Sequence, residues 1–476
     1  MKPNPNDIKV KEMIIIRNSS YMNYVNIGDG TSLLFSGISL CMDLVPKNYL
    51  ESMMKNDYSL LSNEEKDHLV NRGHLTTLSR KQELDAFKKQ ARFILNKNAE
   101  SMKKKQQTLL CFVLTYNCNL SCKYCYQKKL SNKLHIPRMS TEFTNKILTQ
   151  YLPKLFPKVS RNNNISFILF GGEPLLPSNR ESILCILRYA KKHSVKVSTA
   201  TNAIHVPQMI DLFGREYGKI QNVQVTLDGD RSYHNSQRIP SSGKPTFDNM
   251  ISAIRMLKKT NVNVLVRVHT HPKRMNSTRQ LVKYLDKEKI IDDNIKIYFS
   301  PLNSFQNCSK EDISTFRNIF ENVSKKTNVP PSSSLDFLKN FIEMQEEKIL
   351  LKTRFCSLGN DTLRIIDALG DIYECYEEVG DRKRRIATFS NGKLKYFSLK
   401  KTYFKRNILN IPECLKCSLA LFCGGGCPVR ARAQTGSIFK PYCLQNKEFI
   451  AETLKAYFLL RTKLNKEGGE INEKEN

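Results

Sequence analysis

The alternation of apolar and polar positions predicts a small first domain. Three runs have strand character: MIIIR, YMNYVNI and TSLLFSGISL, with Gly28-Asp29-Gly30 as a hairpin turn between the last two. Apolar residues at helical spacing follow in Lys47–Met54, Asn63–Asn71 and Gln82–Leu95. Ser62 is expected to cap the second of these helices, because Glu65 stands where a capping box requires it. Residues 1–100 therefore predict an α+β unit without a catalytic constellation, which suits a binding module.

From Leu109 to about Leu302 the strand and helix patterns alternate. Strand-length apolar runs are LLCFVL, ISFILF, VKVSTAT, NVQVTL, VNVLVRV and IKIYFS. The helical patterns between them are Thr141–Leu155, Arg180–Lys192, Val206–Phe213, Phe247–Lys258 and Arg279–Leu285. Strands joined by crossover helices predict an α/β fold with a parallel sheet, open or curled as a partial (β/α)6 TIM-like barrel. In such folds the chemistry lies at the carboxyl ends of the strands.

The whole pattern divides the chain into five parts. Residues 1–100 and 105–305 precede a helical linker over 306–355, a Cys- and Gly-rich domain over 356–445, and a closing helix with a polar tail over 446–476. The start of the chain carries no stretch of signal-peptide type, and its apolar runs are too short to cross a membrane. We expect a cytoplasmic protein without a membrane partner.

The charge balance is strongly basic but selects no partner. Lys and Arg number 76 against 45 Asp and Glu, a formal net charge of +31. Such a balance suits nucleic acid or an acidic peptide. A solvated lysine-rich surface explains it equally well, because the basic residues are scattered and form no single arm.

The cysteines are more informative. Fourteen are present, and in a cytosolic protein grouped cysteines bind metal more often than they form disulfides. Ten fall into sets: Cys118, Cys122 and Cys125; Cys356 and Cys375; Cys414, Cys417, Cys423, Cys427 and Cys443. Cys41, Cys111, Cys185 and Cys308 stand alone, and the apolar neighbours of Cys111 and Cys185 predict buried thiols.

The first set follows directly after the first strand of the α/β region. Cys118, Cys122 and Cys125 form C-x3-C-x2-C on one loop. Three thiolates suit a soft metal centre and leave one iron of a 4Fe-4S cubane without a protein ligand. A zinc loop is the alternative, but structural zinc takes four ligands and no fourth Cys or His stands nearby. The spacing favours an iron–sulfur cluster.

With Tyr124 before the last cysteine, this loop resembles the signature of the radical S-adenosylmethionine (SAM) superfamily. The resemblance implies that the open iron binds SAM and that reductive cleavage yields a 5′-deoxyadenosyl radical. Gly171–Pro174 resembles the GGEP motif of the family, which implies that Gly172 and Glu173 hold the SAM amino group, the glycines letting backbone approach the ligand. Asn202 ends the third strand, where the family has a residue near the adenosine.

A further match follows the fourth strand. Thr226-Leu227-Asp228-Gly229, then His234 and Arg238, resembles the S-L-D-G…H-D-x-x-R run of peptide- and sulfatase-maturing enzymes. The match implies that Thr226 binds the SAM ribose and Arg238 its carboxylate. Asn235 stands where that family usually has Asp, and for Asp228 a turn-capping role is as well supported as a catalytic one. The SAM contacts implied in total are Tyr124, Gly172, Glu173, Asn202, Thr226 and Arg238.

The C-terminal cysteines resemble the SPASM extension of radical SAM enzymes. That resemblance implies two auxiliary 4Fe-4S clusters, three clusters in all, with ligands Cys414, Cys417, Cys423 and Cys443 for one and Cys356, Cys375 and Cys427 for the other. No cysteine follows closely enough to complete the second set. Either Cys308 is recruited or an iron stays open for a substrate thiolate. A zinc-ribbon-like fold is the alternative for the whole region.

These resemblances imply a radical SAM oxidoreductase that matures a ribosomal peptide, related to sactipeptide, ranthipeptide and sulfatase maturases. Residues 1–100 would be a winged-helix-like unit that captures a precursor leader as an added strand. Thioether formation is the favoured outcome; a carbon–carbon crosslink, epimerisation or formylglycine formation stay open. The expected reductant is a flavodoxin or ferredoxin. An RNA-modifying radical SAM enzyme and a non-enzymatic metal-containing nucleic-acid binder are the rival hypotheses, although nucleic acid is not the favoured partner.

Overall fold

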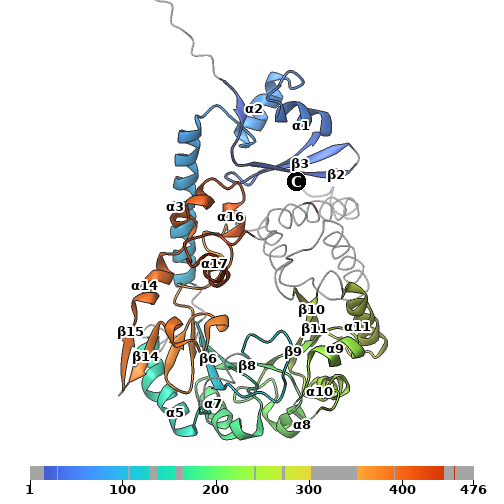
Figure 1. The fold of residues 1–476 in the computed structure, drawn as a ribbon, viewed down its shortest axis with the longest axis vertical. Helices are drawn as coiled ribbons and strands as arrows, with labels where there is room; N and C mark the ends of the chain where they lie inside the picture. Colours follow the sequence, from blue (N-terminus) through green and yellow to red (C-terminus); the bar gives the residue numbers. More distant parts are fainter. Residues whose placement is uncertain are drawn as a thin grey trace, which may run out of the picture.

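The computed structural model describes residues 15–28, 30–104, 108–127, 137–156, 165–240, 243–270, 274–301, 351–390, 392–443 and 455. Figure 1 shows the N-terminal unit at one end, the large sheet at the other, and the C-terminal helices beside the long helix that joins them. Most of the predicted linker and closing helices lies outside the described residues, as does Cys308. Among the helices described, none is long and apolar enough to cross a membrane.

The N-terminal unit is an α+β arrangement around its own small core. The antiparallel sheet contains β2 (Met22–Gly28), β3 (Thr31–Ser36) and β4 (Met42–Pro46), while β1 (Arg17–Asn18) pairs with β5 (Leu75–Thr76). The helices are α1 (Lys47–Met54), α2 (Asn63–Asn71) and α3 (Arg80–Lys104). Leu34, Val45 and Met53 are buried between sheet and helices. The predicted capping box of Ser62 and Glu65 is present at the start of α2.

The six predicted strands of the α/β region are confirmed as parallel neighbours in sequence order. They are β6 (Thr108–Thr115), β7 (Ile165–Gly171), β8 (Lys196–Thr201), β9 (Asn222–Leu227), β10 (Asn263–Thr270) and β11 (Ile295–Pro301). The helices that connect them bury their apolar faces against one side of the sheet. They are α5 (Thr141–Lys146), η1 (Ile147–Tyr151), α6 (Leu152–Leu155), η2 (Pro177–Asn179), α7 (Arg180–Lys192), α8 (Val206–Met209), η3 (Ile210–Leu212), α9 (Arg231–Gln237), α10 (Phe247–Lys259) and α11 (Met275–Lys287).

The C-terminal region continues this sheet. Strand β12 (Leu363–Ile366) pairs parallel with β6, and β13 (Asp371–Tyr373), β14 (Ala387–Ser390) and β15 (Lys393–Tyr396) follow antiparallel, which gives a ten-stranded sheet. The sequence analysis had no strand here, because segments of three or four residues are too short to show a period. Short helices complete the region: η5 (Tyr376–Glu378), η6 (Arg382–Arg384), α14 (Ser398–Lys405), η7 (Ile408–Asn410), α15 (Pro412–Leu415), α16 (Ala420–Cys423) and α17 (Pro428–Thr435).

The N-terminal unit also contacts the C-terminal cysteine region. Tyr21 stacks on Phe87 of α3 with ring centroids 4.6 Å apart, and its hydroxyl donates to the carbonyl of Leu415 at 2.6 Å. Phe35 of β3 meets Phe422 of α16 edge to face. One end of the chain is therefore held against the segment that carries three of the predicted cluster ligands.

Candidate active site and cysteine sets

The C-x3-C-x2-C loop lies at the carboxyl end of β6, the edge of the sheet where the fold predicts chemistry. Cys122 is buried, Cys125 is half-buried and Cys118 is the most exposed of the three. The loop rests on the segment after α9, where the Ser121 N–H donates to the Ile239 carbonyl at 2.6 Å. The three thiols are thus presented on a loop that is anchored at its middle.

Two glycines let this loop lie directly on the turn after β7. Gly171 has φ +140°, and a Cβ on it would lie 2.2 Å from the Thr115 carbonyl oxygen. A Cβ on Gly172 would lie 2.3 Å from the Asn117 oxygen and 2.5 Å from that of Tyr116. From the sequence, these glycines were expected to let the backbone approach a ligand. The structure gives an additional reason for glycine at both positions, which is the close approach of the cysteine-loop backbone.

Tyr124 is the centre of a buried polar network beside the loop. Its hydroxyl donates to Asp228 Oδ2 at 2.6 Å and accepts from Arg238 Nη1 at 2.8 Å. His269, near the carboxyl end of β10, lies with Nδ1 2.9 Å from Asp228 Oδ1 and meets the Tyr124 ring edge-on at 4.8 Å. The structure brings the predicted Tyr124 and Arg238 together. It adds His269, whose only signal in the sequence was its place late in a strand.

The network holds one negative and one positive charge out of water. Burial would raise the pKa of Asp228, but the hydrogen bond with His269 and the charge of Arg238 outweigh it and hold that pKa below its ordinary value. Burial raises the pKa of the Tyr124 hydroxyl, which therefore remains a donor. Among the described residues Arg238 Nε has no hydrogen-bond partner, although only 7% of the residue is exposed. A ligand carboxylate would satisfy this donor.

His234 and Asn235 hold the turn rather than a ligand. His234 Nδ1 accepts from the Asp228 N–H at 3.3 Å, and Nε2 lies 3.3 Å from Thr246 Oγ1. Burial, together with the charge of Arg238, lowers the pKa of His234 to about 3, so the ring is neutral. Asn235 Oδ1 accepts from the backbone N–H groups of Thr246 and Phe247 at 3.0 Å, at the start of α10. An amide oxygen fulfils this role as well as a carboxylate would.

Glu173 joins the GGEP turn to the end of β8. Its fully buried carboxylate accepts from Thr201 Oγ1 at 2.6 Å and from the Asn202 N–H at 2.8 Å. Burial raises the pKa of Glu173. The Asn202 side chain in turn donates to Asn119 Oδ1 at 2.7 Å and lies 3.8 Å from Cys118 Sγ. Both predicted residues therefore border the cysteine loop, with Glu173 bonded to the chain's own donors.

Thr226 lies on the opposite face of the sheet from the helices, in register with Arg267 of β10, which is itself in register with Tyr298 of β11. Arg267 Nη2 donates to Ser300 Oγ at 2.8 Å, and its buried Nε has no partner in the described part of the chain. The sequence analysis missed Arg267, because a charged residue within VNVLVRV looks like an ordinary outward-facing position. It is a second arginine with an unused donor on the face that bears Thr226.

Some cysteines that the sequence assigns to the same cluster affect one another's pKa in the structure. Burial is the main cause of the raised pKa values of Cys118, Cys375 and Cys414, and charge on neighbouring groups adds to it. After burial, the charges of Glu173 and then Cys122 raise the pKa of Cys118 to about 12. Burial with the charges of Cys423, Cys417 and Cys443 raises the pKa of Cys414 to about 12. Burial with the charges of Cys356, Glu377 and Cys427 raises the pKa of Cys375 to about 12. Buried thiols of this kind ionise when a metal binds them, so the donor set fits iron–sulfur ligation.

Within the described residues no three His, Cys, Asp or Glu side chains converge into a ready metal-binding group. The assignment of ligands to clusters therefore stays a proposal. The described cysteines form no disulfide with one another.

Three consecutive glycines lie between Cys423 and Cys427, which the sequence assigns to different clusters. Gly424, Gly425 and Gly426 have φ values of +69°, +83° and +71°, a left-handed turn that L-residues rarely adopt.

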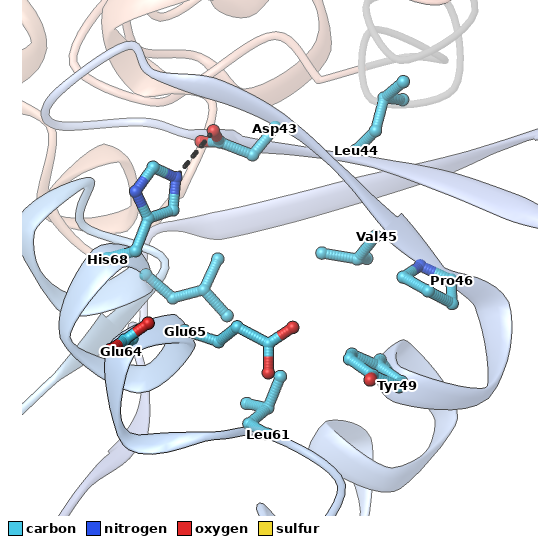
Figure 2. Close-up of a pocket in the computed structure, with 10 residues that line it drawn as sticks. Asp43, Leu44, Val45, Pro46, Tyr49, Leu61, Glu64, Glu65 and His68 are labelled. Atoms are coloured by element: carbon cyan, nitrogen blue, oxygen red, sulfur yellow. Dashed lines mark hydrogen bonds and ion pairs between the residues drawn. The ribbon is translucent and has the colours of Figure 1, made fainter.

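A separate hollow of about 410 Å³ lies in the N-terminal unit between β4 and the helices α1 and α2 (Figure 2). Its lining includes Asp43, Val45, Tyr49, Leu61, Glu65 and His68. Asp43 is held by Arg72 Nε at 2.5 Å and by His74 Nε2 at 2.6 Å. The lining contains no cysteine, so this hollow is distinct from the chemistry described above.

Comparison with known proteins identifies the class. Residues 112–285 match the Radical SAM superfamily. These residues form a radical SAM domain, and that family implies SAM and a 4Fe-4S cluster as cofactors.

Individual relatives are maturases and synthases. The cysteine-type anaerobic sulfatase-maturating enzyme of Clostridium perfringens is 24% identical over 70% of this chain and 92% of its own length. The radical SAM cyclopropyl synthase TigE of Paramaledivibacter caminithermalis is 25% identical over 51% of this chain, which spans about half (54%) of that relative. A structure of native anSMEcpe with bound AdoMet and Cp18Cys peptide superposes with a TM-score of 0.55 at 19% identity, over 75% of this chain and 99% of that one, a likeness of fold.

Proposed function

We propose that this protein is a peptide maturase that cleaves SAM to a 5′-deoxyadenosyl radical and removes a hydrogen atom from a ribosomally made peptide. The observation that carries the proposal is the unpaired donor of Arg238, buried in a polar network with Tyr124 beside three grouped thiols. A carboxylate ligand at this position and a cluster on the thiols are what radical SAM chemistry requires.

A 4Fe-4S cluster held by Cys118, Cys122 and Cys125 would supply the electron that cleaves SAM. Arg238 binds the SAM carboxylate through its unused Nε, and Asp228 and Tyr124 fix the direction of its guanidinium. Around the same loop, Gly172 and Glu173 would lie near the SAM amino group, with the Glu173 carboxylate also bonded to Thr201 and Asn202, while Asn202 would lie near the adenosine and Thr226 near the ribose.

The face of the sheet that carries Thr226 and Arg267 suits the substrate peptide. Arg267 offers its unpaired Nε to a carbonyl or carboxylate of the peptide, and Tyr298 is its neighbour in register. A fixed polar contact of this kind would hold one backbone position of the peptide near the radical.

The C-terminal cysteines suit two further clusters, one at Cys414, Cys417, Cys423 and Cys443 and one at Cys356, Cys375 and Cys427. The second set has three thiols. Either Cys308 is its fourth ligand, or the remaining position binds a substrate thiolate and thioether formation follows at the neighbouring carbon. The reductant would be a flavodoxin or ferredoxin.

The N-terminal unit suits capture of a leader peptide at β4. Among the described strands β4 is an edge. Cys41 and Lys47 hydrogen-bond toward β3, so the alternation of an antiparallel pair turns the backbone N–H and C=O of Leu44 outward. Leu44 is 47% exposed, and the hollow next to β4 would receive a leader side chain. The match to the sulfatase-maturating enzyme covers 70% of this chain, so the unmatched 30% is long enough to include such a unit.

The proposal is tested by anaerobic reconstitution of the full chain. We expect about twelve irons per chain and 5′-deoxyadenosine on reduction with SAM. An Arg238→Met variant should keep its iron but bind SAM weakly. Matched Cys118→Ala, Cys122→Ala and Cys125→Ala substitutions should remove about four irons and all cleavage. Bound zinc, or full iron without SAM cleavage, would contradict the proposal.

Formylglycine formation on a sulfatase is the second candidate, because the match to the sulfatase-maturating enzyme covers 92% of that protein. Mass spectrometry of a Cys-containing peptide after turnover separates the two. A thioether costs the peptide two hydrogens and keeps its sulfur, whereas formylglycine formation replaces the thiol by an aldehyde.

A further inference from the structure

Arg406 is a buried arginine in the C-terminal cysteine region that the proposed reaction has not used. It follows α14 and is only 4% exposed. Its Nε donates to the Ile438 carbonyl at 2.6 Å, and its Nη2 donates to the carbonyls of Gly425 at 3.0 Å and Lys440 at 3.5 Å. These acceptors stand shortly before Cys427 and Cys443, one ligand from each proposed cluster.

No carboxylate balances this charge within the described part of the chain. Arg406 forms no ion pair there, whereas the equally buried Arg364 pairs with Glu374 at 2.6 Å and also with Asp361. A buried cation without a counter-ion is costly, because removal from water is not repaid by carbonyl dipoles alone. The site around Arg406 is therefore completed by something negatively charged.

The groups positioned to supply that charge are the cysteines. Arg406 Nη1 and Cys414 Sγ both approach the same small space over Gly425, 3.4 Å and 3.6 Å from where a Cβ would stand. Burial lowers the pKa of Arg406, while charge on Cys356, Cys414, Cys427 and Cys423 acts against that lowering. Both proposed clusters thus contribute ligands near one guanidinium.

We propose that Arg406 is a shared counter-ion of the two C-terminal clusters and favours their reduced states. The inference rests on the proposed function, since it needs both clusters. Each reduction adds one electron to a cluster and so one negative charge. A fixed buried cation stabilises that added charge and makes the midpoint potential of the cluster less negative.

The test is a redox titration of the full chain, monitored by electron paramagnetic resonance after anaerobic reconstitution. Replacing Cys118, Cys122 and Cys125 by Ala leaves only the C-terminal clusters in the spectrum. In this background Arg406→Met should shift the midpoints of both clusters to more negative values. Arg406→Lys, which keeps the charge but loses the forked hydrogen bonds, should stay near the parent. Arg215→Met, which removes one positive charge from the radical SAM domain, is the control for net charge.

Unchanged midpoints in Arg406→Met at full iron content would overturn the inference, as would a shift in only one cluster. If Arg406→Met loses iron, the Arg406→Lys variant decides between the two roles. Parental iron content and midpoint potentials in Arg406→Lys support a charge effect. Loss of iron in Arg406→Lys as well would show that Arg406 only supports the backbone through its hydrogen bonds. Failure of the proposed function looks different, because the chain with all its cysteines would then bind zinc in place of iron, or would hold full iron and not cleave SAM, whichever residue stands at position 406.

Discussion

At the scale of single residues, the GGEP turn requires glycine because it has no room for a side chain. Position 172 requires glycine, because the backbone oxygens of Tyr116 and Asn117 in the cysteine loop occupy the space that a Cβ would need. Backbone atoms this close cannot move without displacing the loop itself. The loop carries the three thiols, so its position decides whether they form one set.

Gly172→Ala should therefore displace the cysteine loop. We expect a loss of about 1–3 kcal/mol in the free energy of unfolding and of about four of twelve irons, with the C-terminal clusters retained. Iron analysis and thermal unfolding measure both effects. Gly214→Ala is the matched control, because the atoms nearest to its Cβ would be those of the movable Glu216 carboxylate. Full iron in Gly172→Ala would show that the loop tolerates displacement.

Site residues that belong to a recognisable motif could be predicted from the sequence, whereas residues that reach the site only through the fold could not. Tyr124 and Arg238 were found because their spacing is recognisable, and the structure places them in contact. His269 and Arg267 were missed, because nothing local distinguishes a strand residue that faces a site from one that faces solvent. Asn235 looked like a weakened match, yet its oxygen fulfils the helix-capping role.

At the scale of elements, the pairing of β6 with β12 brings a buried acid to the carboxyl end of the sheet. Asp367 follows β12 and accepts from the Tyr116 hydroxyl at 2.9 Å and from the N–H groups of Leu369 and Asp371. Burial, with a smaller contribution from the charge of Asp371, raises the pKa of Asp367 to about 6. The folded chain therefore binds a proton more tightly here than the unfolded chain does.

The contribution of Asp367 to stability should fall as pH rises from about 4 to about 6, and level off above that. Over this window the folded state holds a proton that the unfolded state has released, so each step up in pH favours unfolding. The total loss should be at most about 3 kcal/mol. Asp367→Asn, neutral at every pH and still an acceptor for both N–H groups, should abolish it.

The pH-dependent loss of stability is measured by hydrogen exchange of the β12 amides at pH 5 and pH 7.5, after correction for intrinsic exchange rates. Asp293→Asn, at an exposed carboxylate, should behave like the parent chain at both values. Equal pH dependence in the parent and in Asp367→Asn would show that Asp367 titrates normally.

Element prediction from sequence succeeded where a period could develop. The six strands β6–β11 and helices such as α7 were found nearly residue for residue, because each repeats its apolar pattern over several turns or pleats. Strands β12–β15 are held by their neighbours in the sheet rather than by their own pattern. Their three or four residues carry too little signal to predict pairing with β6.

At the scale of the whole molecule, the described parts share their cores. Residues of β6 such as Cys111 and Val113 are buried against Ile365 and Tyr373 of the C-terminal strands. Helix α3 contributes Phe87 to a separate core cluster that also contains Ile408 and Leu421 of the C-terminal region. The C-terminal region thus covers one edge of the parallel sheet and one face of the helix that leads into it.

A chain ending at residue 350 should therefore fail to fold as the radical SAM domain alone. It would expose the β6 edge and the apolar residues that face β12 and β13, and such edges pair with other chains. We expect aggregation, or a species without a sharp thermal transition, in sedimentation and circular dichroism. A chain ending at Cys443, which keeps all these contacts, should sediment without aggregation and unfold cooperatively. If the shorter chain also unfolded cooperatively and did not aggregate, the parallel sheet would be stable without the C-terminal strands, and the shared core would not be required for folding.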